Sequence, residues 1–120
     1  MKTVLIVDDE LAIADMLAVM LEDEGYHVMT AENGREALIR LAQVRPDVVL
    51  CDVMMPLLDG RELCKAMQSS ADYQSIPIIM MSAASAWQAG TDCRYAAFLS
   101  KPFDLNEVLS VIEQLIGPPK

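Results

Sequence analysis

Three short, uninterrupted apolar runs constrain the fold of this chain most strongly. They are TVLIV at residues 3–7, VVLC at 48–51 and IPIIMM at 76–81. Continuous runs of this length are typical of parallel strands that helices cover on both faces. Two weaker strand patterns, YHVMTA at 26–31 and AAFLS at 96–100, complete the set. The runs therefore predict five strands of one parallel sheet.

Helical patterns separate these strands. Residues 9–25 place Leu17 and Leu21 on one face, and Gly25 follows as a stop. Three later helices begin with a capping residue and a glutamate three positions on: Asn33 with Glu36, Asp59 with Glu62, and Asp104 with Glu107. The order βαβαβαβαβα predicts a doubly wound α/β fold, with strand order 2-1-3-4-5 and helices on both faces of the sheet.

Size and charge exclude several classes of protein. The 120 residues suit one domain, which we place at residues 1–117, with 118–120 as a terminus or the start of a linker. The net charge of −9 argues against direct binding to nucleic acid or an anionic membrane, since phosphate neutralisation needs clustered Lys and Arg. We expect no membrane span and no signal peptide. The thiols of Cys51, Cys64 and Cys93 lack CxxC spacing and predict a reduced, cytoplasmic protein.

Acidic residues stand at the carboxyl ends of two predicted strands. Asp8 and Asp9 end VLIVDDE, and Asp52 ends VVLCD. Ligands of open α/β sheets bind outside the carboxyl ends of the strands, where the strand order reverses, and strands one and three flank that point. Three anions so close together would have raised pKa values unless a cation were present. Mg²⁺, a hard ion that prefers oxygen ligands, is the expected cofactor.

Two further strand ends add polar groups to the same edge. The fourth strand ends at the hydroxyl of Ser82, and the fifth is followed by the ammonium of Lys101. A carboxylate, a metal site, a hydroxyl and a lysine form a set suited to phosphoryl transfer. Asp52 would be the nucleophile, the metal and Lys101 would neutralise the transferred group, and Ser82 would donate to one of its oxygens.

At these motifs the chain resembles the receiver domain of bacterial two-component response regulators. The resemblance covers nearly the whole chain and rests on VDDE, CDVMMPLLDG, MSAA and FLSKPF, each at the expected strand end. It implies a flavodoxin-like fold. It also implies a signalling switch, rather than a turnover enzyme, that acts on an effector domain or a target protein. In such a switch Asp52 takes its phosphoryl group from the phosphohistidine of a sensor histidine kinase or a phosphotransfer protein.

The resemblance also implies roles for individual residues. Mg²⁺ would be held by Asp8, Asp9, Asp52 and the backbone carbonyl of Met54. Ser82 and Phe98 would form the switch pair, and Lys101 would contact the phosphate. Met54 and Ala84 occupy the variable sites that tune hydrolysis, and their apolar side chains predict a phosphoryl group that survives for minutes or more.

One segment departs from the family pattern. Between Ser82 and Lys101 the chain is shorter than is usual by ~3 residues, close to one helical turn. Gly90 lies in the middle of this segment and weakens helix there. We therefore expect a short or irregular fourth helix. Because the family dimerises through the fourth helix, fifth strand and fifth helix, dimerisation is left open.

Other interpretations exist for the chain and for single residues. A small Mg²⁺-dependent phosphatase or phosphotransferase would also form an aspartyl phosphate. Such an enzyme typically carries a D-x-D pair, whereas Val53 and Met54 follow Asp52 here. A nucleotide-binding module would need a glycine-rich or Walker motif, which the sequence lacks. Taken singly, each residue has a simpler interpretation: Asp9 as a cap of the first helix, Lys101 as a solvated charge, and Phe98 as a core residue.

Overall fold

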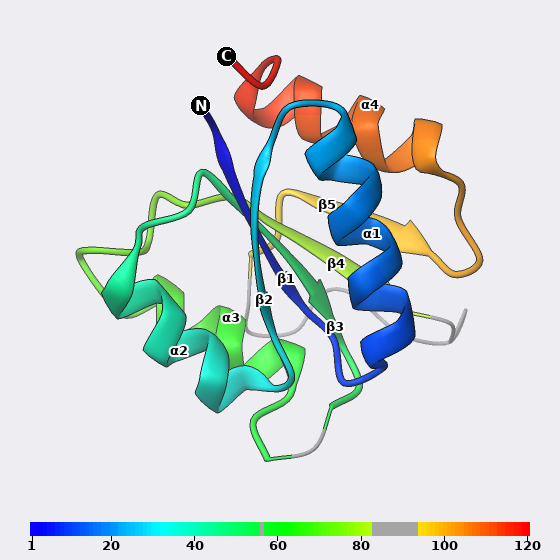
Figure 1. Cartoon of the computed structure of the whole chain (residues 1–120). Helices are drawn as coiled ribbons and strands as arrows, with labels where there is room; N and C mark the ends of the chain where they lie inside the picture. Colours follow the sequence, from blue (N-terminus) through cyan, green and yellow to red (C-terminus); the bar gives the residue numbers. More distant parts are fainter. Residues whose placement is uncertain (56, 83–93) are drawn as a thin grey trace.

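The computed structural model describes residues 1–55, 57–82 and 94–120, and its centre is a parallel sheet (Figure 1). The strands are β1 (Thr3–Val7), β2 (His27–Ala31), β3 (Val48–Asp52), β4 (Ile78–Ser82) and β5 (Ala97–Ser100). They lie in the order β2-β1-β3-β4-β5, and every neighbouring pair is parallel. The predicted fold class and strand order are therefore confirmed.

Helices cover both faces of this sheet. They are α1 (Leu11–Asp23), α2 (Gly34–Gln43), α3 (Gly60–Gln68) and α4 (Leu105–Ile116). α1 and α4 pack on one face, against side chains such as Ile6 and Leu50, and α2 and α3 pack on the other, against Leu5 and Val49 (Figure 1). Burial on both faces explains why β1, β3 and β4 are almost wholly apolar, apart from Thr3 at the start of β1 and the last residues of the other two, Asp52 and Ser82.

The predicted fourth helix and three residues named from the sequence, Ala84, Gly90 and Cys93, lie outside the described part of the chain. The segment 83–93, which includes Ala84, and residue 56 are not described. The expected short helix and the role of Ala84 in hydrolysis therefore stay predictions. The label α4 belongs to the helix that follows β5.

Several element boundaries differ from the sequence-based prediction by one or two residues, and two of the differences have a clear local cause. β4 begins at Ile78 rather than at Ile76, because Pro77 has no N–H to donate to the strand ladder. Helix α1 has Glu10, not Asp9, at its N-cap position. The backbone N–H of Glu10 donates to Asp8 Oδ1 at 2.9 Å, and the helix starts only after that turn. Capping by Asp9, the alternative to metal binding, is therefore wrong.

The two ends of the chain meet at the edge of the sheet opposite the polar strand ends. The Lys2 ammonium donates to the carbonyl of Ile116, and the Tyr26 hydroxyl donates to that of Gly117 at 3.3 Å. Helix α4 has no basic residue in its own last turn, so Lys2 supplies the cation that favours a helix C-terminus. Among the described helices, none has the length and apolar character needed to cross a bilayer.

The capping box of α4 provides a test of the local folding signals. The Asp104 carboxylate accepts the N–H of Glu107 at 2.8 Å, and Glu107 reaches back to the N–H of Asp104. We expect Asp104→Ala to lower the free energy of unfolding by about 1 kcal/mol. Urea denaturation would measure this. The control is Asn106→Ala in the same turn, and equal stabilities of the two variants would contradict the capping role.

Candidate functional site

The carboxyl ends of the strands bring three of the predicted groups together. Asp8 directly follows β1, Asp52 is the last residue of β3, and Lys101 follows β5. Val7 pairs with Cys51 in the β1–β3 ladder, which places the two acids on neighbouring strands. Asp8 is fully buried, and Asp52 is 5% exposed. These carboxylates are therefore held by rigid strands below the surface.

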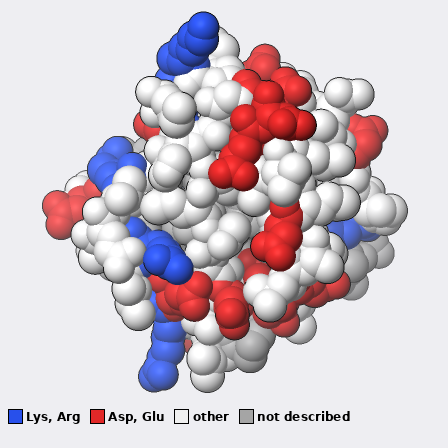
Figure 2. All heavy atoms as spheres, in the orientation of Figure 1, with Lys and Arg blue, Asp and Glu red and all other residues white. Residues whose placement is uncertain are grey.

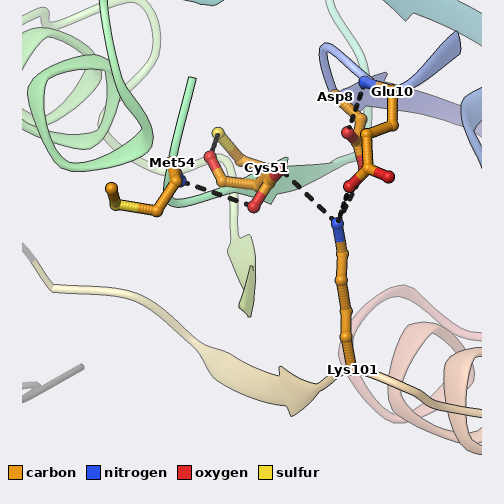
Figure 3. A network of polar contacts seen from close by, with 6 residues as sticks. Asp8, Glu10, Cys51, Met54 and Lys101 are labelled. Carbon is orange, nitrogen blue, oxygen red and sulfur yellow. Dashed lines mark hydrogen bonds and ion pairs between the residues drawn. The ribbon is translucent and has the colours of Figure 1, made fainter. Parts of the chain in front are cut away.

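Lys101 joins the acids through its ammonium group (Figure 3). Its Nζ lies 3.2 Å from Asp8 Oδ2 and 3.4 Å from Asp52 Oδ2. One cation thus bridges two acids that are far apart in sequence and stand at the ends of different strands. Removing this ammonium would leave buried carboxylates facing each other with no opposite charge between them.

Glu10 is a third acid at this cluster, and sequence reasoning did not assign it a role. Its Oε1 lies 3.5 Å from Lys101 Nζ, and carboxylate oxygens of Asp8, Glu10 and Asp52 all lie within 4.8 Å of one another. Asp9 is exposed and is not part of this group among the described residues. The signal was present in the motif VDDE, whose third acid follows the predicted pair directly.

The surroundings of the cluster change how its groups ionise. Burial raises the pKa of the Asp52 carboxyl to about 6, with Lys101 acting to lower it and Asp8 to raise it. Burial opposes the charge of Lys101, but Asp52 and Asp8 outweigh this effect, so the pKa of Lys101 is raised. Lys101 therefore compensates the negative charge of Asp52 only in part, as expected for a carboxylate that can bind a further cation.

The carbonyl end of β3 is shaped by close contact with α3. The Met54 N–H donates to Asp52 Oδ1 at 3.4 Å, and the Gly60 N–H donates to the Val53 carbonyl at 3.0 Å. A Cβ atom on Gly60 would lie 2.5 Å from the Asp52 carbonyl oxygen. Glycine is required here because the first turn of α3 touches the backbone of the acid itself. Met54 is 66% exposed, and its side chain points away from Lys101 (Figure 3).

Ser82 lies on β4, the strand next to that of Asp52, and Phe98 lies on β5, one strand further out. Ser82 is buried at the end of β4, and its carbonyl accepts the N–H of Lys101 at 2.9 Å. Phe98 on β5 is half-buried, packs against the core on the α2 and α3 side, and stacks at a tilt on Tyr95 with ring centroids 6.3 Å apart. The structure thus brings Ser82 to the edge that carries the acids. The switch role of the pair stays a prediction.

The donor set fits a divalent cation such as Mg²⁺. The carboxylates of Asp8, Glu10 and Asp52 are oxygen ligands of the kind that Mg²⁺ prefers, and they outnumber the single ammonium of Lys101. Burial is the largest cause of the raised pKa of Asp52, and Lys101 offsets that effect only in part. A metal bound to these oxygens would supply the missing positive charge.

Charge is unevenly distributed over the two helix layers. Helices α1 and α4 contain acids but no Lys or Arg, whereas α2 carries Arg35 and Arg40 and α3 carries Arg61 and Lys65. In Figure 2 acidic side chains gather over the side of α1 and α4, and basic ones lie toward α2. The negative charge on the surface of α1 and α4 repels the phosphates of nucleic acids.

Comparisons with curated proteins connect this geometry to a family. The chain is 41% identical over 116 residues to the response regulator MprA of Mycolicibacterium vanbaalenii, a match that covers 94% of this chain and 49% of that protein. It is 40% identical over 120 residues to MprA of Mycobacterium avium, which covers 98% of this chain and 52% of that protein. The chain therefore spans about half the length of the curated relatives that it matches.

Solved structures with the same fold include two response regulators. The chemotaxis response regulator CheY4 of Vibrio cholerae has a TM-score of 0.88 and 36% identity, and the match covers 96% of this chain and 98% of that one. TrrA of Thermotoga maritima, solved in complex with Mg²⁺ and BeF, has a TM-score of 0.87 and 31% identity, with 96% and 99% covered. The family model of the response regulator receiver domain matches residues 4–113. The chain thus belongs to the response regulator receiver domains of two-component signalling.

Proposed function

We propose that this receiver domain is a phosphoacceptor switch in which Asp52 takes a phosphoryl group from a phosphohistidine. The donor is a sensor histidine kinase or a phosphotransfer protein, and the cofactor is Mg²⁺. The reaction belongs in the cytoplasm, and the buried thiol of Cys51, which forms no disulfide, fits a reducing compartment. The modified domain then acts on an effector domain or a target protein and does not turn over a substrate.

The observation that carries this proposal is the position of Lys101 between two buried acids. A lysine that only neutralised charge could lie anywhere near Asp8 or Asp52, but this one bridges both at 3.2 and 3.4 Å at the mouth of the sheet. A phosphoryl group on Asp52 would bring its own negative oxygens to that ammonium. The same cation would thus serve the acid before transfer and the phosphoryl group after it.

The chemistry follows from the groups present. An ionised Asp52 oxygen attacks phosphorus, the phosphorus–nitrogen bond of the phosphohistidine breaks, and the imidazole leaves with the electron pair. Lys101 would neutralise charge on the transferred group, and the Ser82 hydroxyl would donate to one of its oxygens. Bound Mg²⁺ would supply further positive charge. The family pattern assigns Asp8, Asp9, Asp52 and the Met54 carbonyl as its ligands, and the structure adds Glu10 to the acids at this site.

A groove beside the acids offers a place for the donor protein to bind. It has a volume of about 380 Å³, lies between α1 and the residues after β5, and has a largely apolar lining bounded by Glu10 and Lys101. The apolar lining residues are Ile13, Met16, Pro102 and Phe103. Because Lys101 belongs both to this groove and to the acid cluster, a helix seated here would carry its phosphohistidine close to Asp52.

Phosphoryl acceptance can be tested with a small donor. Incubation with acetyl phosphate and Mg²⁺ should add one phosphoryl group to the wild-type chain and none to Asp52→Asn, because the amide is not a nucleophile. Intact-mass analysis would measure this. Asp72→Asn, which changes an exposed acid distant from the cluster, is the matched control and should be labelled like the wild type. Full labelling of Asp52→Asn would remove Asp52 from the proposed role.

The metal ligands can be separated by paired substitutions. The family pattern assigns Asp9 as a ligand, whereas the structure brings Glu10 to the cluster. We expect Asp9→Asn and Asp52→Asn to weaken Mg²⁺ binding, because a neutral amide replaces an anionic oxygen, and we expect Glu10→Gln to weaken it less. Calorimetric titration with MgCl₂ would rank the variants. Unchanged binding in Asp9→Asn together with a large loss in Glu10→Gln would assign the ligand to Glu10 instead.

The raised pKa of Asp52 predicts a pH-dependent stability. Without metal, the unfolded chain releases the Asp52 proton near its ordinary value of 3.8, whereas the folded chain holds it to about pH 6. Between these values the folded state binds more protons, so the free energy of unfolding falls as pH rises. The Asp52→Asn variant does not lose stability in this way, because asparagine has no proton to release in this pH range. Its stability relative to the wild type should therefore grow between pH 4 and pH 7, by up to about 3 kcal/mol.

Urea denaturation in EDTA at several pH values would measure this difference. Repeating the series with Mg²⁺ should reduce it, because the metal compensates the ionised carboxylate. A difference that stays constant from pH 4 to pH 7 would show that Asp52 ionises in the folded chain as it does in the unfolded one.

A further inference from the structure

The turn between β2 and α2 touches both loops that carry the acid cluster. The Ala31 carbonyl accepts the N–H of Asp8 at 3.1 Å, and the Gly34 N–H donates to the Leu58 carbonyl at 3.0 Å. Asp8 is itself one of the clustered acids, and Leu58 belongs to the connection between β3 and α3 that also contains Met54. A short stretch of chain outside the cluster thus contacts the backbone on both sides of it.

Gly34 meets this connection so closely that no side chain fits. It is buried as the first residue of α2, and a Cβ atom there would lie 2.4 Å from the Leu58 carbonyl oxygen and 2.7 Å from Leu58 Cβ. The Leu58 carbonyl would have to move by about 1 Å to reach the ordinary contact distance of 3.4 Å. Gly34 does not have a positive φ, so glycine is needed here for space and not for backbone conformation.

The connection held by Gly34 is under conformational strain. Leu57 has a φ of +67°, in the left-handed region that leucine rarely adopts, and its side chain is 68% exposed. Burial of that side chain therefore cannot be what holds the conformation. A strained residue persists only when its surroundings fix it. Leu58 directly follows Leu57, and the hydrogen bond from the Gly34 N–H to the Leu58 carbonyl helps to fix this strained conformation.

We propose that Gly34 is a positioning residue for the reaction of Asp52. This inference rests on the proposed function. The N-terminus of α2 holds the Leu58 carbonyl, and the Gly60 N–H, two residues further on, holds the Val53 carbonyl and with it the backbone beside Met54. That backbone presents the Met54 carbonyl and directs the Met54 N–H to Asp52 Oδ1. Displacing Leu58 moves these groups away from the geometry that metal binding and phosphoryl acceptance require, without altering any ligand.

The test compares Gly34→Ala with Arg35→Ala. Arg35 is the next residue of α2 and is exposed, so its replacement gives α2 an alanine in the same turn with no pressure on Leu58. Calorimetric titration with MgCl₂ is carried out without denaturant, at a pH where both variants are folded. It should give about tenfold weaker binding for Gly34→Ala and no change for Arg35→Ala. Labelling by acetyl phosphate at saturating Mg²⁺ should also be slower for Gly34→Ala.

A role in packing alone gives a different result. Gly34→Ala would then lower the free energy of unfolding, but its folded molecules would bind Mg²⁺ and accept phosphate like the wild type, and this would overturn the inference. Should Gly34→Ala not fold, the double variant Gly34→Ala with Leu58→Ala removes the Leu58 Cδ2 atom that the new Cβ would meet at 2.9 Å, but still displaces the Leu58 carbonyl oxygen, which lies 2.4 Å from that Cβ. It should weaken Mg²⁺ binding in the same direction, and wild-type binding would again overturn the inference.

The two proposals fail in distinguishable ways. If the wild-type chain itself takes no phosphoryl group on Asp52, the proposed function is wrong and the role of Gly34 falls with it. If the wild type is labelled and binds Mg²⁺, but the Gly34 and Leu58 variants match it, only the positioning role is wrong.

Discussion

The contact of the Lys101 ammonium with the carboxylates of Asp8 and Asp52 is the interaction on which the site depends. Two buried acids on neighbouring strands repel each other, and burial adds to the cost of their charges. Lys101 offsets part of this cost at 3.2 and 3.4 Å, but a third acid, Glu10, leaves the cluster with more carboxylates than ammonium groups. This excess of negative charge favours the binding of a divalent cation at the carboxyl ends of the strands.

This cluster exists because the sheet is parallel and β1 lies beside β3. All strands then end at the same edge, so residues as distant in sequence as Asp8, Asp52 and Lys101 meet without any special loop. The helices contribute at a second level. Gly60 brings the start of α3 against Asp52, and Gly34 brings the start of α2 against Leu58. Strands thus place the reacting groups, and helix N-termini fix the connection between them.

Much of this could be predicted from sequence because the signals are local. Continuous apolar runs gave the strands, and the capping residues Asp59 and Asp104 marked two helix starts. Strand-end acids gave Asp8 and Asp52. The rest depends on tertiary contacts. No local signal distinguishes the burial of Asp8 from the exposure of Asp9, because both follow the same strand. Nor does the sequence reveal that Gly34 faces a carbonyl 24 residues further along the chain.

A crystal structure of the chain with Mg²⁺ and beryllofluoride, a mimic of a phosphoryl group, tests the central claim most directly. The account predicts beryllium bonded to an Asp52 carboxylate oxygen, and Lys101 Nζ in contact with a fluoride rather than with Asp52 alone. It also predicts Mg²⁺ in contact with Asp52 and the Met54 carbonyl. Beryllofluoride bound elsewhere, or a Lys101 ammonium that stays paired only with Asp8 and Glu10, would contradict the account.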